Sequence, residues 1–202
     1  MTGRFTIGLD LGQAFDYTAL AVLEERDRGL YDLRHVERHR DEPYPLVVER
    51  TRLLARRLPG TVALAVDATG VGRPVVDMLR EGRGAEEVYG ITLTGGEAAV
   101  RKGDDFQVPK REVVASVAGL LQTGRLRIPR SLPGAAVLER ELRRFRARIT
   151  RTGRDAYEAC HEADHDDMVL AVALGCWFCE RGRNGWLMAV QEGVRRQRGT
   201  RR

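Results

Sequence analysis

The sequence predicts a single α/β domain built around a mixed β-sheet. Three patterns indicate this class: strand-like alternation in the first forty residues, a strand–helix–strand unit in the middle, and a strongly apolar helix later on. The chain has 202 residues, of which 43% are hydrophobic, so it is long enough for one well-buried core.

The N-terminal part predicts an antiparallel meander. Residues 4–10, 17–25 and 30–38 each alternate between apolar and polar side chains, and short turns separate them. Residues 44–58 then repeat apolar side chains at helical spacing, with prolines near the start and a Pro-Gly pair at the end. We therefore expect three neighbouring strands followed by a helix.

The next segment predicts parallel strands. The stretch VALAVD (62–67) is a continuous apolar run ending in aspartate, which is typical of a strand buried on both faces. A helix over 71–81 and a strand over 87–92 follow, an order that requires a parallel, right-handed crossover. Together with the meander, these strands give a central mixed five-stranded sheet flanked by helices.

The later segments predict mainly helices. In chain order we expect a loop (94–109), a helix (110–122), a short strand or bend (126–129), a helix (131–149), a small hairpin (150–160) and a last helix (164–181). The helix over 131–149 has two distinct sides. Its apolar side comprises Leu138, Leu142, Phe145 and Ile149, and its arginine stripe comprises Arg140, Arg144, Arg148 and Arg151.

The positive charge lies mainly at the C-terminal end. The net charge is +5, but residues 181–202 contain seven arginines and one glutamate, so the rest of the chain is close to neutral. We expect a domain over 1–180 and a basic, flexible tail over 181–202 that holds phosphate nonspecifically or is simply solvated. Three cysteines argue against a disulfide framework, and Cys176 and Cys179 fit core positions one turn apart. With neither a long apolar run nor a secretory signal, we expect a soluble, intracellular protein without a membrane partner.

Acidic residues stand at three corresponding places. Asp10 ends the first strand, Asp67 ends the later parallel strand, and Asp164, Asp166 and Asp167 begin the last helix. Each aspartate alone also fits turn or helix-capping chemistry. If the two strands pair, however, their carboxyl ends meet, and such a carboxylate cluster needs hard cations such as Mg²⁺ or Mn²⁺. Two such ions would suit the hydrolysis of a phosphodiester.

Four blocks of the sequence resemble one known family. These are IGLDLGQAFDYTALAVLE, VALAVDATGVGRPVVDMLRE, VPKREVVASVAGLLQTGRLRIP and HDDMVLAVALGCWF. Together they are similar to the nuclease domain of the large terminase subunit of tailed bacteriophages, over about residues 4–180. The resemblance implies a ribonuclease H-like fold and a metal-dependent endonuclease that cuts concatemeric viral DNA during genome packaging.

The resemblance also implies roles for individual residues. Asp10 and Asp67 would be the first two metal ligands, and Asp167 the third, with Asp166 an equally plausible companion. Asp164 lies one turn earlier, and His165 either helps to hold water or is a helix-start residue without chemistry. Residues expected to approach DNA phosphates are Lys110, Arg111, Arg140, Arg144 and Arg148.

The resemblance implies partners as well. They are double-stranded DNA, an ATPase motor, a portal and a small terminase, in the cytoplasm of a bacterial host. The chain contains no G-x-x-x-x-G-K-[ST] motif, so the motor would have to be supplied elsewhere.

Three alternatives remain at this level. The first is a Holliday-junction resolvase or another nuclease of the same fold, which would cut four-way DNA by shape. The second is a nucleotide-binding protein of the actin and sugar-kinase superfamily, which also begins with a GLDLG-like hairpin but needs a second phosphate hairpin. The third is a noncatalytic DNA-binding module that uses the basic tail.

Overall fold

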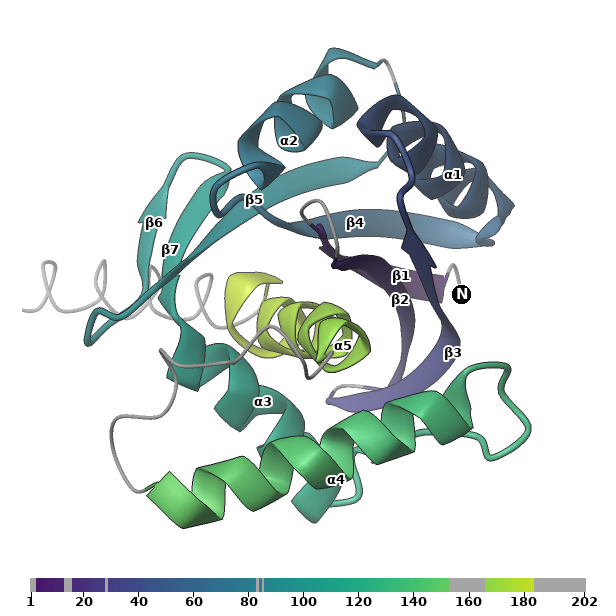
Figure 1. The fold of residues 1–202 in the computed structure, drawn as a ribbon. Coiled ribbons are helices and arrows are strands. Elements are labelled where there is room, and N and C mark those ends of the chain that lie inside the picture. The colour runs from purple at the N-terminus through teal and green to yellow at the C-terminus, as the bar shows by residue number, and fades with distance from the viewer. Residues whose placement is uncertain are drawn as a thin grey trace, which may run out of the picture.

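The structure is an eight-stranded mixed β-sheet with helices on both faces (Figure 1). This computed structural model describes residues 3–12, 16–27, 29–82, 84, 86–152 and 166–183, and for 146–152 only the course of the backbone. The strands are β1 (Gly3–Asp10), β2 (Tyr17–Asp27), β3 (Leu30–Arg40), β4 (Gly60–Asp67), β5 (Glu87–Thr94), β6 (Val100–Lys102), β7 (Asp105–Pro109) and β8 (Leu126–Arg127). The helices are α1 (Tyr44–Arg57), α2 (Gly72–Glu81), α3 (Lys110–Gln122), α4 (Ala135–Thr152), α5 (Asp167–Trp177) and the π-helix η1 (Phe178–Arg183).

The strand order joins an antiparallel half to a parallel half at β1. The order across the sheet is β6-β7-β5-β4-β1-β2-β3-β8. Strands β1, β2 and β3 form the predicted antiparallel meander, while β4 pairs with β1 in parallel and β5 pairs with β4 in parallel. The five predicted strands are therefore the centre of the observed sheet.

The loop predicted for residues 94–109 is wrong, because most of this segment extends the sheet. Strand β7 pairs in parallel with β5, and β6 pairs antiparallel with β7. Phe106 and Val108 alternate along β7 and are both buried. The glycines that suggested a loop lie at the turns, and β7 is stabilised by pairing with β5 on one side and with β6 on the other.

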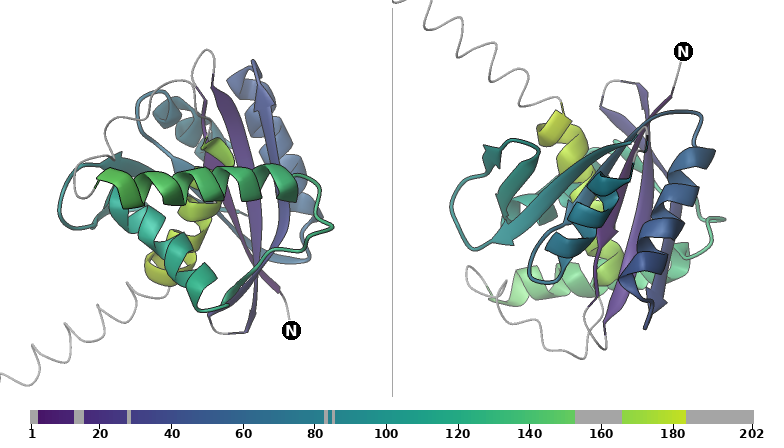
Figure 2. Two further views of the ribbon diagram at one scale, coloured as in Figure 1. Left: turned by 60° about the horizontal axis from the view of Figure 1, so that its bottom comes forward. Right: turned by 90° about the horizontal axis from the view of Figure 1, so that it is seen from above.

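Helices cover the two faces of the sheet in two layers (Figures 1 and 2). Helices α1 and α2 pack on one face, in a core that includes Ile7, Leu9 and Leu64. Helices α3, α4 and α5 pack on the other, in a core that includes Leu33, Leu138 and Leu174. Among the described residues, no helix is long and apolar enough to cross a membrane.

Helix α5 crosses β1 at very close range, and glycine makes this possible. A Cβ atom on Gly8 would lie 1.9 Å from the carbonyl oxygen of Ala171 and 2.9 Å from the nitrogen of Gly175. A second glycine, Gly175, stands on the helix side of this contact. The backbone of α5 is thereby brought directly against the central strand.

Several helix ends differ from the prediction. Helix α4 begins at Ala135 rather than at 131, because Gly134 adopts a positive φ of 85° just before it. The hairpin predicted for 150–160 is wrong at its start, where 150–152 continue α4, while 153–160 lie outside the described residues. Helix α5 begins at Asp167 and passes into η1, so the predicted single helix ends as a π-helix.

The C-terminal end of the described chain is tied to the domain. Glu180 accepts hydrogen bonds from the Tyr31 hydroxyl at 2.8 Å and from Arg125 at 2.6 and 2.9 Å. Cys176 and Cys179 are buried and not in a disulfide, as expected for core residues. Residues 184–202 of the predicted tail lie outside the described part of the chain.

Candidate active site

Strand pairing brings Asp10 and Asp67 to the same edge of the sheet. Leu9 pairs with Val66 in the parallel β1–β4 ladder, and each aspartate is the next residue and the last of its strand. Side chains alternate along a strand, and Ile7 and Leu9 face α1 and α2. Asp10 therefore faces α5, and the same alternation directs Asp67 to that face.

The start of α5 adds two further acids. Asp166 is the N-cap residue of α5 and Asp167 is its first residue. The charges of both act on Asp10, together with that of Asp67. Asp10 and Asp167 are only 8% and 7% exposed. Four of the predicted site residues are thus gathered at one place, which we call the acidic edge: Asp10, Asp67, Asp166 and Asp167.

The electrostatics of the acidic edge favour a cation. Burial raises the pKa of Asp10 well above its ordinary value, and the negative charges of Asp67, Asp167 and Asp166 raise it further. Burial also raises the pKa of Asp67, although Thr69 opposes this by donating its backbone N–H to Asp67 Oδ1 at 2.7 Å. A cation bound here would lower the pKa of both Asp10 and Asp67.

Lys110 lies beside these acids. Strand β7 runs parallel to β5 and ends at the same edge of the sheet, so α3 begins there with Lys110. The positive charge of Lys110 lowers the pKa of both Asp10 and Asp67, opposing the effect of burial. The sequence assigned Lys110 to DNA phosphate, and the structure places it next to the carboxylates.

The donor chemistry of the acidic edge suits a hard divalent cation. Carboxylate oxygens are the preferred protein ligands of Mg²⁺ and Mn²⁺. Within the described residues, no three His, Cys, Asp or Glu side chains stand close enough to form a ready-made metal site. Because the charges of Asp67, Asp166 and Asp167 act unfavourably on Asp10, we expect this cluster to close only around a cation.

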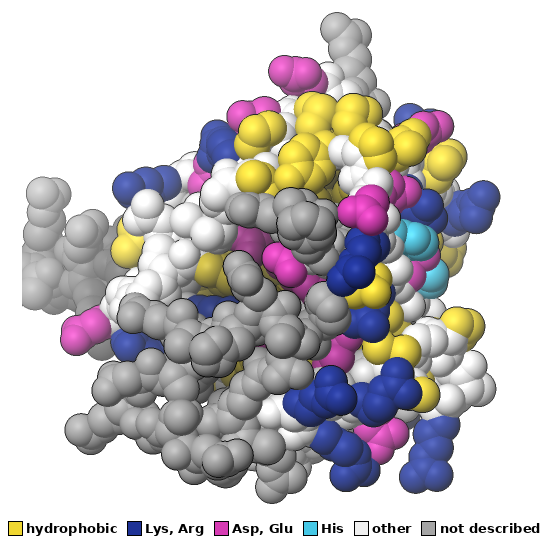
Figure 3. Space-filling model, viewed as in Figure 1, with side chains coloured by type: hydrophobic (Ala, Val, Ile, Leu, Met, Phe, Trp, Pro, Cys, Tyr) yellow, Lys and Arg dark blue, Asp and Glu magenta, His cyan; other side chains and the backbone are white. Residues whose placement is uncertain are grey.

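The other predicted site residues are more scattered. Arg111 is exposed and donates to the carbonyl oxygen of Glu97 at 2.9 Å. Arg140 and Arg144 are exposed on α4. Figure 3 shows Lys and Arg side chains gathered over the N-terminal part of α4, and Asp and Glu side chains nearer the middle of the same view. Outside the described residues or side chains lie Asp164, His165 and the Arg148 side chain.

One buried residue near the site was missed by the sequence analysis. Glu141 on α4 is 5% exposed, and the charge of Asp167 acts on it. It lies three residues after Leu138 and four before Phe145, so it shares their face of the helix. A charged residue within an apolar helix face was the signal that could have identified it.

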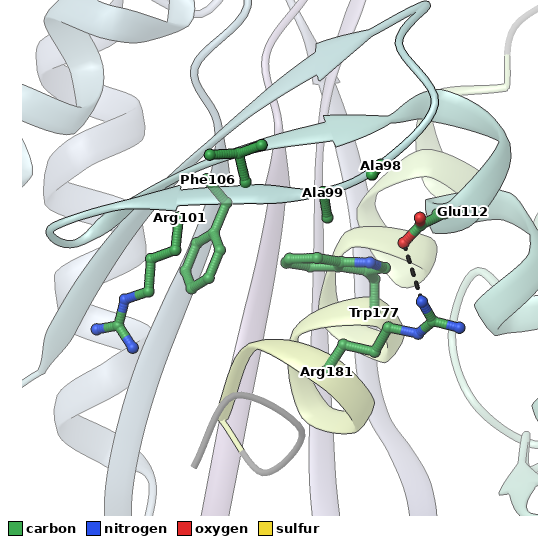
Figure 4. A pocket seen from close by; sticks show the side chains of 8 residues that line it. Ala98, Ala99, Arg101, Phe106, Glu112, Trp177 and Arg181 are labelled. Carbon is green, nitrogen blue, oxygen red and sulfur yellow. Dashed lines mark hydrogen bonds and ion pairs between the residues drawn. The ribbon is translucent and has the colours of Figure 1, made fainter. Parts of the chain in front are cut away.

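A hollow of about 410 Å³ lies around the C-terminal end of α5 and differs in character from the acidic edge (Figure 4). Its walls are largely aromatic and aliphatic. Phe106 and Trp177 pack edge to face at 5.3 Å, and the Arg101 guanidinium lies 5.3 Å from the Phe106 ring centre. Arg181 and Glu112 form an ion pair at 3.2 Å on the other side of Trp177. None of the residues that line this hollow belongs to the acidic edge.

The fold and the acidic edge define the class of the protein. An antiparallel three-stranded meander continued by parallel strands, with acids at the ends of β1 and β4 and at the start of a crossing helix, is a ribonuclease H-like arrangement. The sequence matches the family model for the terminase RNase H-like domain over residues 7–175. The chain belongs to this family, so both the resemblance and the fold class predicted from the sequence are confirmed.

Solved structures show the same fold. The zinc-bound large terminase nuclease of thermophilic phage G20c is 21% identical, with a TM-score of 0.54 over 86% of this chain and 80% of that one. The Mn-soaked, inhibitor-bound terminase nuclease domain of human cytomegalovirus is 10% identical, with a TM-score of 0.56 over 87% and 82%. A large terminase from another thermophilic bacteriophage is 10% identical, with a TM-score of 0.53 over 88% and 39%. No curated protein matches the sequence.

Proposed function

We propose that this chain is a metal-dependent endodeoxyribonuclease that cuts concatemeric viral DNA during genome packaging. The observation that carries the proposal is the convergence of four aspartates from two strands and a helix at one edge of the sheet. A turn or capping role would explain each aspartate alone, but it would not explain why they meet in a largely buried place. Membership of the terminase family supports the same activity.

The acids have distinct positions within this proposal. Asp10, Asp67 and Asp167 are the principal metal ligands, and Asp166 lies beside them as a further ligand. When bound, two Mg²⁺ or Mn²⁺ ions would activate water and stabilise the leaving oxygen of the phosphodiester. The buried carboxylate of Asp10 fixes the centre of the site, since its strand is paired on both sides.

Lys110 has a different part in the proposed site. Its charge already offsets the charges of Asp10 and Asp67. A lysine at this edge favours the ionised form of the carboxylates, which cation binding requires, and it also presents positive charge where a DNA phosphate would arrive.

DNA would be held mainly through its backbone. Arg111, Arg140 and Arg144 are exposed, and Arg148 follows on the same helix. Arginine side chains on a surface suit phosphate contacts, which position DNA without reading its sequence. We therefore expect weak sequence preference, with the cutting position set by partners: an ATPase motor, a portal and a small terminase in the host-cell cytoplasm.

Cleavage of supercoiled plasmid tests the proposal. The purified chain would be incubated with EDTA, Mg²⁺ or Mn²⁺, beside Asp67→Asn and the control Asp77→Asn. Asp77 is an exposed aspartate on α2 that pairs with Arg73 at 3.3 Å, away from the acidic edge. We expect metal-dependent nicking and linearisation in the wild type and the control, and a loss of at least about 100-fold in Asp67→Asn.

Direct binding measurements separate the possible outcomes. Mn²⁺ binding, followed by electron paramagnetic resonance, should weaken in Asp67→Asn and persist in Asp77→Asn. Cleavage that survives in Asp67→Asn would remove this aspartate from the proposed site. DNA binding without metal binding or cleavage would favour a noncatalytic module, and selective cutting of four-way junctions would favour a resolvase.

A further inference from the structure

The first turn of α5 is capped by a residue from another helix. The first backbone N–H groups of a helix need acceptors, and an aspartate at the N-cap ordinarily supplies one. Asp166 makes no side-chain cap hydrogen bond in α5. Instead, Glu141 Oε2 on α4 accepts from the backbone nitrogens of Met168 at 3.1 Å and Val169 at 3.4 Å. The turn that carries Asp166 and Asp167 is therefore fastened from α4.

Glu141 is itself fixed by an arginine from the sheet. Its second oxygen, Oε1, accepts from Arg38 Nη1 at 2.7 Å, and Glu141 is only 5% exposed. The guanidinium of Arg38 also stacks on the Tyr17 ring at 4.2 Å. With both carboxylate oxygens bonded, Glu141 is held in one orientation.

The position of Arg38 relates this contact to the acidic edge. Asp10 pairs with Ala19 on β2, and Ala19 pairs with Arg38 on β3. Residues paired across neighbouring strands point to the same face of a sheet, so Asp10 and Arg38 lie in one row on the face covered by α5. Ala19, which lies between them, has a small side chain, so α5 can pack close to this row of residues.

We infer that Glu141 and Arg38 are positioning residues of the proposed nuclease. They hold the first turn of α5 so that Asp167 and Asp166 face Asp10 and Asp67. This inference rests on the proposed function and adds two residues that touch neither metal nor DNA.

A fixed support is needed because the acids repel one another. The charges of Asp67, Asp166 and Asp167 all act unfavourably on Asp10, and that of Asp167 acts unfavourably on Glu141. Without a bond to the sheet, the least costly relaxation is for the start of α5 to move away from β1. Glu141 is bonded both to this turn and to Arg38 on the sheet, so it holds the turn at a fixed position relative to the sheet. The outer hydrogen-bond partners of metal ligands orient those ligands in the same way.

Substitutions at Glu141 provide the test. Glu141→Ala removes the cap and the ion pair, whereas Glu141→Gln keeps an amide oxygen for Met168 and Val169 but loses the charge facing Arg38. We expect the Mn²⁺ concentration for half-maximal plasmid cleavage to rise about 10- to 100-fold in Glu141→Ala and less in Glu141→Gln. Saturating Mn²⁺ should restore most of the rate, and the KM for DNA should change little.

The matched control lies on the same helix. Glu139 is exposed and pairs locally with Arg143 at 2.7 Å, so Glu139→Ala should leave the Mn²⁺ dependence unchanged. Arg38→Gln should shift the Mn²⁺ dependence in the same direction as Glu141→Gln. The double variant, Arg38→Gln with Glu141→Gln, should need no more Mn²⁺ for half-maximal cleavage than the more strongly affected single variant, because the two residues act as a unit.

The outcomes distinguish this inference from the proposed function. Direct Mn²⁺ binding and melting temperature are measured on every variant. If Glu141→Ala does not fold, Glu141→Gln and Arg38→Gln still provide the comparison. A wild type that cleaves, beside folded variants with unchanged Mn²⁺ dependence, overturns the positioning role alone. A wild type that neither binds Mn²⁺ nor cleaves overturns the proposed function, and the positioning role with it.

Discussion

Asp10 illustrates how a residue can serve a site at the expense of stability. It is 8% exposed, ends a central strand, and has its pKa raised by burial and then by the charges of Asp67, Asp167 and Asp166. Folding therefore places a carboxylate where its charged form is disfavoured. A strongly perturbed carboxylate within a cluster of acids is a candidate functional residue, which agrees with the role proposed for Asp10.

Replacing Asp10 should stabilise the metal-free protein. Asp10→Asn keeps the side-chain shape but removes one of the repelling charges. In EDTA at neutral pH we expect the free energy of unfolding to rise, because a carboxylate whose pKa is raised by folding destabilises the folded state at any pH above its ordinary pKa. Chemical denaturation measures this change, with the exposed Asp77→Asn as the control.

Added Mn²⁺ should make the wild type more stable than Asp10→Asn, the reverse of the order expected in EDTA. The wild type should gain stability as the ion binds the folded state, and Asp10→Asn should gain much less. A variant that is less stable than the wild type in EDTA, or that gains equally from Mn²⁺, would show that repulsion at Asp10 is not the controlling effect.

The crossing of α5 over β1 is the contact between elements on which the acidic edge depends. At Gly8 a methyl group would meet the carbonyl oxygen of Ala171 at 1.9 Å, and a backbone atom cannot rotate away as a side chain can. Gly8→Ala should force α5 off the strand, and overpacking of this kind costs about 1–3 kcal/mol. We expect a loss of stability toward the upper end of that range.

A glycine in open space provides the control for this prediction. A Cβ atom added to Gly119, inside α3, would have nothing within 4 Å, so Gly119→Ala should stabilise the protein by about 0.5–1 kcal/mol. Thermal unfolding measures both variants. Equal effects of the two substitutions would argue against the tight crossing, and a folded Gly8→Ala should also bind Mn²⁺ more weakly because Asp167 moves with α5.

The sequence predicted those elements whose pattern is local and long. Strands β1 to β5 and helices α1 to α3 carry clear alternation or helical spacing, and the structure has them close to the predicted ranges. Strand β7 was missed because its pattern rests on two buried residues, Phe106 and Val108, and its partner β5 is supplied by the fold. The start of α4 was placed four residues too early, ahead of Pro133 and Gly134, whereas the helix begins at Ala135 after the turn at Gly134.

The same division applies to the site. Asp10 and Asp67 were predicted from strand ends, because parallel strands bring their carboxyl ends together. Lys110 was noticed, but its place beside Asp10 depends on β7, which was not predicted. Glu141 could have been singled out as a charged residue on an apolar helix face, but its contacts with Met168 and Arg38 are tertiary, and no spacing along the chain encodes them.

At the scale of the whole molecule, the two helical layers offer a test of how DNA is held. Helix α4 belongs to the layer that contains α5, whereas α1 covers the opposite face of the sheet. Both helices carry exposed arginines: Arg140 and Arg144 on α4, and Arg56 and Arg57 at the end of α1. If DNA approaches the acidic edge along α4, only the first pair should contribute to binding.

The salt dependence of DNA affinity measures this contribution. Each phosphate contact adds about 0.9 to the slope of log affinity against log salt concentration, because condensed counterions are released. In EDTA, which prevents cleavage, Arg140→Ala with Arg144→Ala should reduce the magnitude of this slope by about 2. Arg56→Ala with Arg57→Ala removes the same charge from the opposite face and should leave the slope unchanged. Equal losses from both pairs would mean that net charge attracts DNA without a preferred face, and a loss confined to the α1 pair would place the DNA on the other side of the sheet.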